Sequence, residues 1–129
     1  MITDLLFVYG TLRRDCPNGA HPQYLAGAEF ITSAQVRGKL YRVSYYPALV
    51  LDDGGWVQGE IYRLHNEQQL ARLDAYEECT YPASPEQEYQ RCVINAQTAN
   101  GETFKVWVYA WQRPLENLPL IASGDFLNP

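Results

Sequence analysis

LLFVYGTLRR, residues 5–14, is an apolar run that ends abruptly at a glycine. Five apolar or aromatic residues followed by a turn residue predict a short strand that is buried on both faces. Gly10 permits a sharp turn or the close approach of another group to the backbone. The N–H groups of such a turn, with the Thr11 hydroxyl beside them, can hold an anion or an oxyanion. An ordinary strand end is the alternative interpretation.

Turn residues divide the rest of the chain into short elements. Residues 13–28 are polar and rich in turn formers, which predicts a loop with a helical turn at 23–25. Further strands are predicted at residues 36–43, 48–51, 56–64, 88–97 and 103–111. The turn DDGG at 52–55 predicts a hairpin between 48–51 and 56–64. Asn100-Gly101 predicts a second hairpin, between the last two strands.

Residues 66–78 predict the one substantial helix. Asn66 can cap it, with Gln69 in the capping-box position, and Leu70 and Leu73 give it an apolar stripe. Many strands, one helix and strands that are apolar on both faces predict an α+β fold. We expect a small mixed β-barrel or strongly curled sheet with the helix packed on it.

The composition indicates a single domain over residues 1–129 and excludes several classes of protein. A hydrophobic fraction of 47% supports a core, and a net charge of −5 argues against a nucleic-acid surface. No apolar run approaches the roughly 20 residues of a membrane helix, and no signal peptide is recognisable. We therefore expect a cytoplasmic protein that binds neither membrane nor nucleic acid.

The cysteines and histidines do not suggest a metal site. Cys16, Cys79 and Cys92 are an odd number without the spacing of metal ligands, which fits a reducing compartment and three free thiols. His21 and His65 lie far apart, with no cysteine near enough to suggest zinc. We expect no metal and no cofactor.

Glu77 is the most informative single residue of the predicted helix. It follows Leu70 by seven positions and Leu73 by four, so it falls on the apolar stripe, whereas Glu78 falls with Asp74 on the polar side. A carboxylate that faces a core is costly unless it is paired or functional, and burial would raise its pKa into the range of a general acid or base. Alternatively, Glu77 reaches water at a frayed helix end.

Several segments resemble, in the right order, the signatures of one family. Residues 8–12 are Val-Tyr-Gly-Thr-Leu, residues 73–77 are Leu-Asp-Ala-Tyr-Glu and residues 89–91 are Tyr-Gln-Arg. Residues 38–41, 46–49, 57–62 and 123–126 add Gly-Lys-Leu-Tyr, Tyr-Pro-Ala-Leu, Val-Gln-Gly-Glu-Ile-Tyr and Ser-Gly-Asp-Phe. The chain resembles the gamma-glutamylcyclotransferase-like proteins, which include gamma-glutamylamine cyclotransferases and plant AIG2-like proteins.

This resemblance implies a reaction in which the substrate supplies its own nucleophile. The α-amine of a gamma-glutamyl amine or peptide attacks the γ-amide, which gives 5-oxoproline and releases an amine. The family pattern implies Glu77 as the general acid/base and Tyr9, Gly10, Thr11 and Leu12 as the substrate cradle. Glu78 departs from the pattern, because many members have glycine or another residue there. Alignment on Leu73-Asp74 nevertheless selects Glu77.

Two further expectations concern charged strand residues. We expect Arg91 to have a structural role, and Glu60 to be exposed or paired with a neighbouring arginine such as Arg63. The alternative function is a non-catalytic or regulatory module that binds a small acidic gamma-glutamyl-like ligand. A buried carboxylate would oppose the binding of an anion, so Glu77 favours the enzyme.

Overall fold

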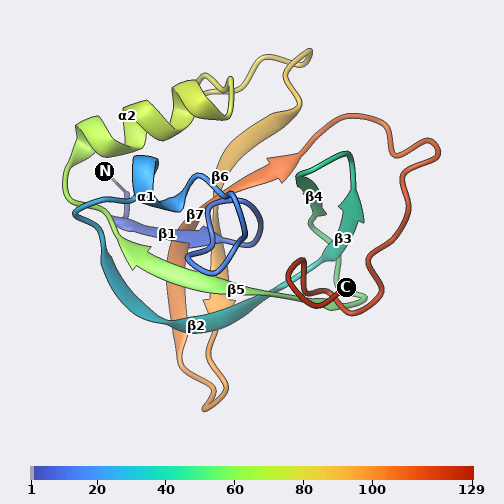
Figure 1. Cartoon of the computed structure of the whole chain (residues 1–129), viewed down its shortest axis with the longest axis horizontal. Coiled ribbons are helices and arrows are strands. Elements are labelled where there is room, and N and C mark those ends of the chain that lie inside the picture. The colour runs from blue at the N-terminus through green and yellow to red at the C-terminus, as the bar shows by residue number, and fades with distance from the viewer. Residues whose placement is uncertain (1) are drawn as a thin grey trace.

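The computed structural model describes residues 2–129, which form two helices and seven strands in the order β1-α1-β2-β3-β4-β5-α2-β6-β7 (Figure 1). The helices are α1 (His21–Tyr24) and α2 (Glu67–Tyr76). The strands are β1 (Leu5–Val8), β2 (Glu29–Arg37), β3 (Lys39–Arg42), β4 (Pro47–Val50), β5 (Trp56–Arg63), β6 (Tyr89–Gln97) and β7 (Thr103–Trp111).

Five of the strands form a closed barrel in the order β1-β5-β2-β6-β7. The neighbours pair antiparallel, except that β1 and β7 close the barrel as a parallel pair with Leu6 opposite Trp107. Strands β3 and β4 form a separate two-stranded sheet beside it. The predicted α+β fold with a small mixed barrel is therefore confirmed.

The core lies on both sides of the barrel wall, because alternate strand residues point to opposite faces. One cluster, which includes Phe7, Val57, Val106 and Val108, fills the inside. A second cluster packs α2 against the outside through Leu70 and Leu73, which contact a group that includes Leu6, Val8, Trp107 and Tyr109. This packing holds the C-terminal end of α2 beside the end of β1, where the chain turns at Gly10.

Helix α2 begins as predicted and ends earlier. The Asn66 side chain accepts a hydrogen bond from Gln69 N at 2.9 Å, and the Gln69 side chain accepts one from His65 N at 2.7 Å. The predicted range of 66–78 was too long, because the helix ends at Tyr76 and Glu78 has a φ of 53°. That left-handed residue turns the chain sharply, so the side chains of Glu77 and Glu78 leave the helix end in different directions.

The hairpin prediction at Asn100-Gly101 is confirmed, since β6 and β7 pair from Tyr89 opposite Trp111 to Gln97 opposite Thr103. The prediction of a hairpin between 48–51 and 56–64 was wrong. Strand β4 pairs with β3 instead, and β5 lies between β1 and β2. In the closed barrel β5 pairs with β1 and β2, and the turn signal at 52–55 could not predict these partners because it depends only on local sequence.

The single strand predicted at 36–43 was also wrong. It is divided at Gly38 into the end of β2 and the whole of β3. A β-carbon on Gly38 would lie 2.7 Å from the carbonyl oxygen of Val50, so the close approach of β4 requires glycine here. Strand β2 also includes residues 29–35, which were not predicted to form a strand, and its first residues are largely exposed.

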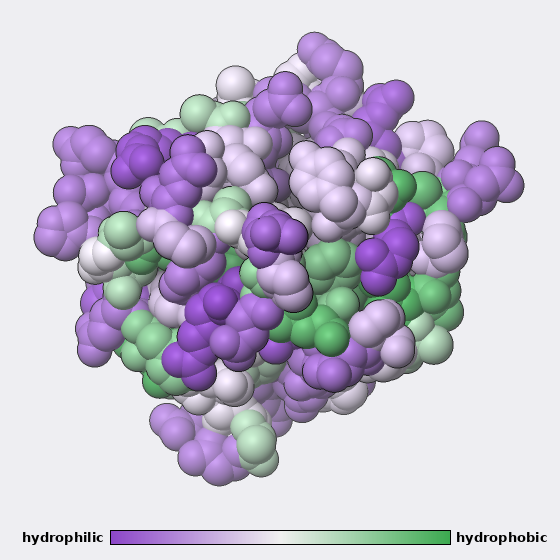
Figure 2. All heavy atoms as spheres, in the orientation of Figure 1, coloured by the Kyte–Doolittle hydropathy of each residue, from purple (hydrophilic) through white to green (hydrophobic). Residues whose placement is uncertain are grey.

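The surface of the face seen in Figure 1 is hydrophilic along most of its edge, with hydrophobic side chains visible mainly in its middle and beside the β3–β4 sheet (Figure 2). Within residues 2–129, neither helix has the length and apolar character that crossing a bilayer requires.

Candidate active site

A cavity of about 170 Å³ opens where the end of β1 meets the end of α2. The predicted cradle residues Tyr9, Gly10, Thr11 and Leu12 line it together with the predicted acid/base Glu77. Its other lining residues come from β1, the β3–β4 turn, the end of α2, the start of β6 and β7: Phe7, Val8, Tyr45, Tyr46, Pro47, Tyr76, Glu78, Glu88, Tyr89 and Tyr109.

The loop at Gly10 has backbone N–H groups available for a ligand. Its carbonyl groups are used inside the protein, since Arg13 N donates to Gly10 O at 3.0 Å and Ala20 N donates to Thr11 O at 2.8 Å. The N–H groups of Gly10, Thr11 and Leu12 donate no hydrogen bond to any part of residues 2–129. Consecutive free N–H groups beside a cavity form a site suited to a carboxylate or an oxyanion.

Gly10 is required by space rather than by an unusual φ. A β-carbon at this position would lie 2.6 Å from Cγ of Pro47, the residue that begins β4. The predicted close approach to the Gly10 backbone is therefore found, and the group that approaches is the proline ring.

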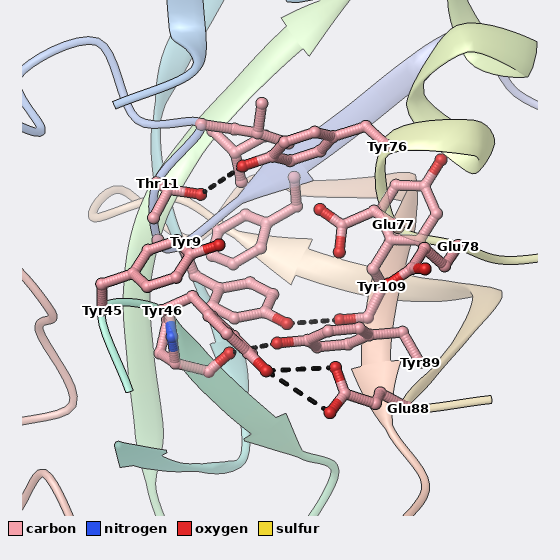
Figure 3. Close-up of a pocket in the computed structure, with 15 residues that line it drawn as sticks. Tyr9, Thr11, Tyr45, Tyr46, Tyr76, Glu77, Glu78, Glu88, Tyr89 and Tyr109 are labelled. Carbon is pink, nitrogen blue, oxygen red and sulfur yellow. Dashed lines mark hydrogen bonds between the residues drawn. The ribbon is translucent and has the colours of Figure 1, made fainter. Parts of the chain in front are cut away.

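Glu77 points into the cavity, with Tyr76 and Thr11 on one side and Tyr9 and Tyr89 on the other (Figure 3). Its side chain is half-buried, and no group within residues 2–129 hydrogen-bonds to its carboxylate. Burial, followed by the charges of Glu88 and Asp74, raises the pKa of Glu77 to about 8. A carboxyl group with this pKa can both accept and return a proton near neutral pH.

Three buried phenols of the cavity donate their hydroxyl groups to fixed acceptors of the protein. Tyr9 donates to the carbonyl oxygen of Tyr109, Tyr89 donates to Pro47 O at 2.6 Å, and Tyr109 donates to Asp74 Oδ1 at 2.7 Å. Burial is the main cause that raises the pKa of Tyr9, Tyr89 and Tyr109, so all three stay neutral. They shape the cavity wall, and their hydrogen bonds join the end of β1 to β7, β6 to β4, and β7 to α2.

Asp74 does not face water, so its predicted place on the polar side of the helix was wrong. It accepts the Tyr109 hydroxyl and pairs with Arg91, whose Nη1 lies 3.4 Å from Oδ2. The Arg91 guanidinium contacts two rings, 4.4 Å from the centroid of Tyr81 and 4.3 Å from that of Trp107. These contacts agree with the structural role expected for Arg91.

Glu78, predicted to face water, is exposed but lies at the mouth of the cavity. Glu88 lies at the same mouth and accepts the Tyr46 hydroxyl at 3.2 Å. The mouth thus carries two carboxylates and two tyrosines, Tyr45 and Tyr46, whose rings meet edge to face.

Glu60 was predicted to be exposed or paired with a neighbouring arginine such as Arg63; it is buried, and the arginine that pairs with it is Arg13. Only 3% of Glu60 is exposed, and its Oε2 lies 2.8 Å from Nε of Arg13. Oε1 accepts hydrogen bonds from Arg14 N and from the Tyr62 hydroxyl. Arg13 also pairs with Asp125 at 2.8 Å, so this network anchors the chain just beyond the cradle to β5 and to the C-terminal segment.

No group of three or more histidine, cysteine, aspartate or glutamate side chains within residues 2–129 is placed to hold a metal ion. Cys79 is buried, Cys16 and Cys92 are half-buried, and all three are free thiols. The lining of the cavity instead includes the half-buried Glu77 carboxyl group and the loop at Gly10, whose N–H groups donate no hydrogen bond within residues 2–129.

Comparisons with known proteins agree over almost the whole chain. A family model described as gamma-glutamyl cyclotransferase, AIG2-like, matches residues 6–128. The gamma-glutamylcyclotransferase family protein YtfP of Escherichia coli (strain K12) is 37% identical over 130 residues, which span 95% of this chain and 96% of that protein.

Solved structures of similar proteins have the same fold. The solution structure of ytfP from Escherichia coli has a TM-score of 0.66 and 35% identity over 96% of each chain. The crystal structure of an AIG2-like protein from Mus musculus has a TM-score of 0.73 and 30% identity, over 91% of this chain and 84% of that one. The matched range of 6–128 includes every residue that lines the cavity.

Proposed function

The chain belongs to the gamma-glutamyl cyclotransferase, AIG2-like family, and we propose on that basis that it cyclises gamma-glutamyl amines or peptides to 5-oxoproline. The observation that carries this proposal is the Glu77 carboxyl group, which points into the cavity without a hydrogen-bond partner within residues 2–129 and has a pKa of about 8. Tyr9, Gly10, Thr11 and Leu12 line the same cavity and are the proposed substrate cradle.

The reaction needs one proton to move between two nitrogens of the same substrate. Glu77 takes a proton from the α-amine as that nitrogen attacks the γ-carbonyl carbon. The C–N bond of the former amide then breaks, and Glu77 returns the proton to the departing nitrogen. The products are 5-oxoproline and a free amine, and Glu77 ends the cycle in its original state.

The chain supplies position and charge rather than a nucleophile. The free N–H groups at Gly10, Thr11 and Leu12 suit the α-carboxylate of the substrate or the oxyanion on the γ-carbon. Holding the substrate in a folded shape brings its amine close to its own carbonyl, which contributes much of the rate enhancement of such a ring closure.

A binding module without catalysis is supported less well. Glu77 would repel an anionic ligand when ionised, and its burial and its carboxylate neighbours oppose ionisation. A protein that only bound a gamma-glutamyl-like anion would be improved by an amide or an apolar residue here. Retention of an unpaired carboxyl group therefore favours proton transfer.

The test is release of 5-oxoproline from a panel of gamma-glutamyl amines and gamma-glutamyl amino acids by the parent protein and by Glu77→Gln. Glutamine keeps the shape of the side chain but cannot take the proton, so turnover should fall by about 10²-fold or more. An inactive parent protein, or a Glu77→Gln variant as active as the parent, would refute the proposal.

A further inference from the structure

The hydroxyl groups that line the cavity are nearly all occupied by the protein itself. Tyr9, Tyr89 and Tyr109 donate to internal acceptors, and Tyr46 donates to Glu88. Each phenol has a single O–H to give. These four side chains therefore have no proton to donate to a substrate.

Other side-chain donors are scarce in the cavity. The residues of 2–129 that line it include no lysine, arginine, histidine, asparagine, glutamine or tryptophan. Tyr45 directs its hydroxyl toward the cavity from the mouth, but 75% of this residue is exposed, so it is a less shielded donor than a group of the cavity wall. The remaining hydroxyl groups are those of Thr11 and Tyr76, whose oxygens lie 3.1 Å apart.

The hydrogen bond between Thr11 and Tyr76 uses only one of their two O–H groups. One hydroxyl donates to the other, so the acceptor of the pair keeps its own O–H free. Figure 3 shows the pair on the same side of the cavity, with the Glu77 carboxylate directed into the space next to it. The charge of Glu77 is one of the causes that raise the pKa of Tyr76, after burial, which agrees with this closeness.

We propose that Tyr76 is a second catalytic residue: it accepts a hydrogen bond from Thr11 and donates its own hydroxyl to the γ-carbonyl oxygen of the substrate. This inference rests on the proposed cyclotransferase function. A phenol is a stronger donor than an aliphatic hydroxyl because it is more acidic, so Tyr76 suits the developing oxyanion and Thr11 suits the role of its support.

The γ-carbonyl oxygen is the acceptor that the geometry favours. Glu77 must reach both nitrogens bound to the γ-carbon, so that carbon lies beside Glu77, and its oxygen is held next to the preceding residue, Tyr76. The N–H groups of Gly10, Thr11 and Leu12 are then left for the α-carboxylate, which needs several donors. The two ends of the substrate are thus bound by different groups.

The first experiment is steady-state kinetics of Tyr76→Phe on the best substrate of the panel. A donor to developing charge acts mainly in the transition state, so kcat should fall tenfold to a hundredfold while KM changes less than about threefold. Thr11→Val should give a smaller loss of kcat, because Tyr76 keeps its hydroxyl and loses only its support.

Tyr24→Phe is the matched control. The Tyr24 ring lies tilted against that of Tyr76, with the ring centroids 4.4 Å apart, but Tyr24 does not line the cavity. The kcat of Tyr24→Phe should therefore stay within twofold of the parent value. Melting temperatures of the three variants should all stay near the parent value, which separates a lost donor from a disturbed fold.

A change in the substrate tests the contact directly. Replacement of the γ-carbonyl oxygen by sulfur, a poor hydrogen-bond acceptor, should slow the parent protein, and the factor should be several times smaller in Tyr76→Phe. An unchanged kcat in Tyr76→Phe, a loss confined to KM, or an equal sulfur effect in both proteins would overturn the role of Tyr76. If the parent is active and Glu77→Gln is inactive, any of these results overturns only the role of Tyr76, and the proposed function stands. An inactive parent protein would overturn both the proposed function and this inference.

Discussion

Glu60 is buried and Glu77 is half-buried, and the surroundings of their carboxylates differ in kind. Glu60 is held by Arg13, by Arg14 N and by the Tyr62 hydroxyl. Glu77 has no hydrogen-bond partner within residues 2–129, and the charges near it are those of other carboxylates. A buried carboxylate whose oxygens are all satisfied contributes to structure, whereas one left unsatisfied beside a cavity is available for chemistry.

The comparison predicts opposite effects on stability when each charge is removed. Glu60→Gln leaves Arg13 with Asp125 as its remaining partner, in a network where Arg13 is only 13% exposed. Loss of one member of a buried pair should lower the free energy of unfolding by roughly 3 kcal/mol. Urea denaturation of the variant and the parent measures this difference.

The matched control for Glu60→Gln is Glu29→Gln. Glu29 contacts Arg63 at 3.4 Å on the surface, where both side chains are about half exposed or more. Such a pair contributes at most about 1 kcal/mol. Equal losses in the two variants would show that burial of the Glu60 network has no special effect on stability.

Glu77→Gln should stabilise the protein, and the effect should depend on pH. The pKa of Glu77 is raised in the folded state to about 8, so the folded protein keeps this proton while the unfolded chain loses it. The parent therefore loses stability as the pH rises from about 4.5 toward 8, at up to roughly 1.4 kcal/mol for each pH unit between the two pKa values.

The variant should equal the parent at pH 4 and become progressively more stable than the parent as the pH rises to 8.5, where the difference should be largest. Thermal unfolding of both proteins across this range measures the difference. A constant difference at all pH values would mean that the glutamine acts through packing rather than by removing a charge.

A smaller effect is expected from Glu88→Gln at the mouth of the cavity. The charge of Glu88 helps to raise the pKa of Glu77, so its removal makes ionisation of Glu77 easier. The acid limb of the pH–rate profile should move to lower pH by less than about one unit, and less at high salt. Glu102→Gln in the distant β6–β7 turn should leave the profile unchanged.

The smallest effect is expected from Glu78→Gln. Glu78 is exposed, and its left-handed backbone directs the chain away from α2. Both turnover and melting temperature should remain close to the parent values. If Glu78→Gln were inactive and Glu77→Gln active, proton transfer would belong to Glu78, and its assignment to Glu77 would be wrong.

Local signals predicted the parts of the fold that depend on local structure. The Asn66 cap and the Asn100-Gly101 turn act within a few residues, and both elements were predicted correctly apart from the last turn of α2. The partners of β4 and β5 depend on closure of the barrel, so a turn signal at 52–55 could not reveal them.

In the candidate site too, the sequence predicted some features, whereas others depend on contacts between distant segments. Helix spacing placed Glu77 on the apolar stripe, and the family resemblance joined it to the loop at 9–12. All of these residues line the cavity. The Tyr109–Asp74 bond and the burial of Glu60 join segments far apart in sequence, so nothing local indicated them. Asp74 precedes Glu77 by three residues, and that spacing could have predicted a shared helix face.

The parallel contact between β1 and β7 has a consequence for how the protein is made. Leu6 lies opposite Trp107, so the first strand of the barrel in chain order is completed by its last. Tyr9 follows β1 and Tyr109 lies in β7, and the hydroxyl of the first binds the backbone of the second. During synthesis β1 cannot pair with β7 until β7 has left the ribosome, because closure of the barrel depends on contacts between residues distant in sequence. No nascent chain that stops short of β7 can contain the cavity, so every molecule should be inactive until its barrel has closed.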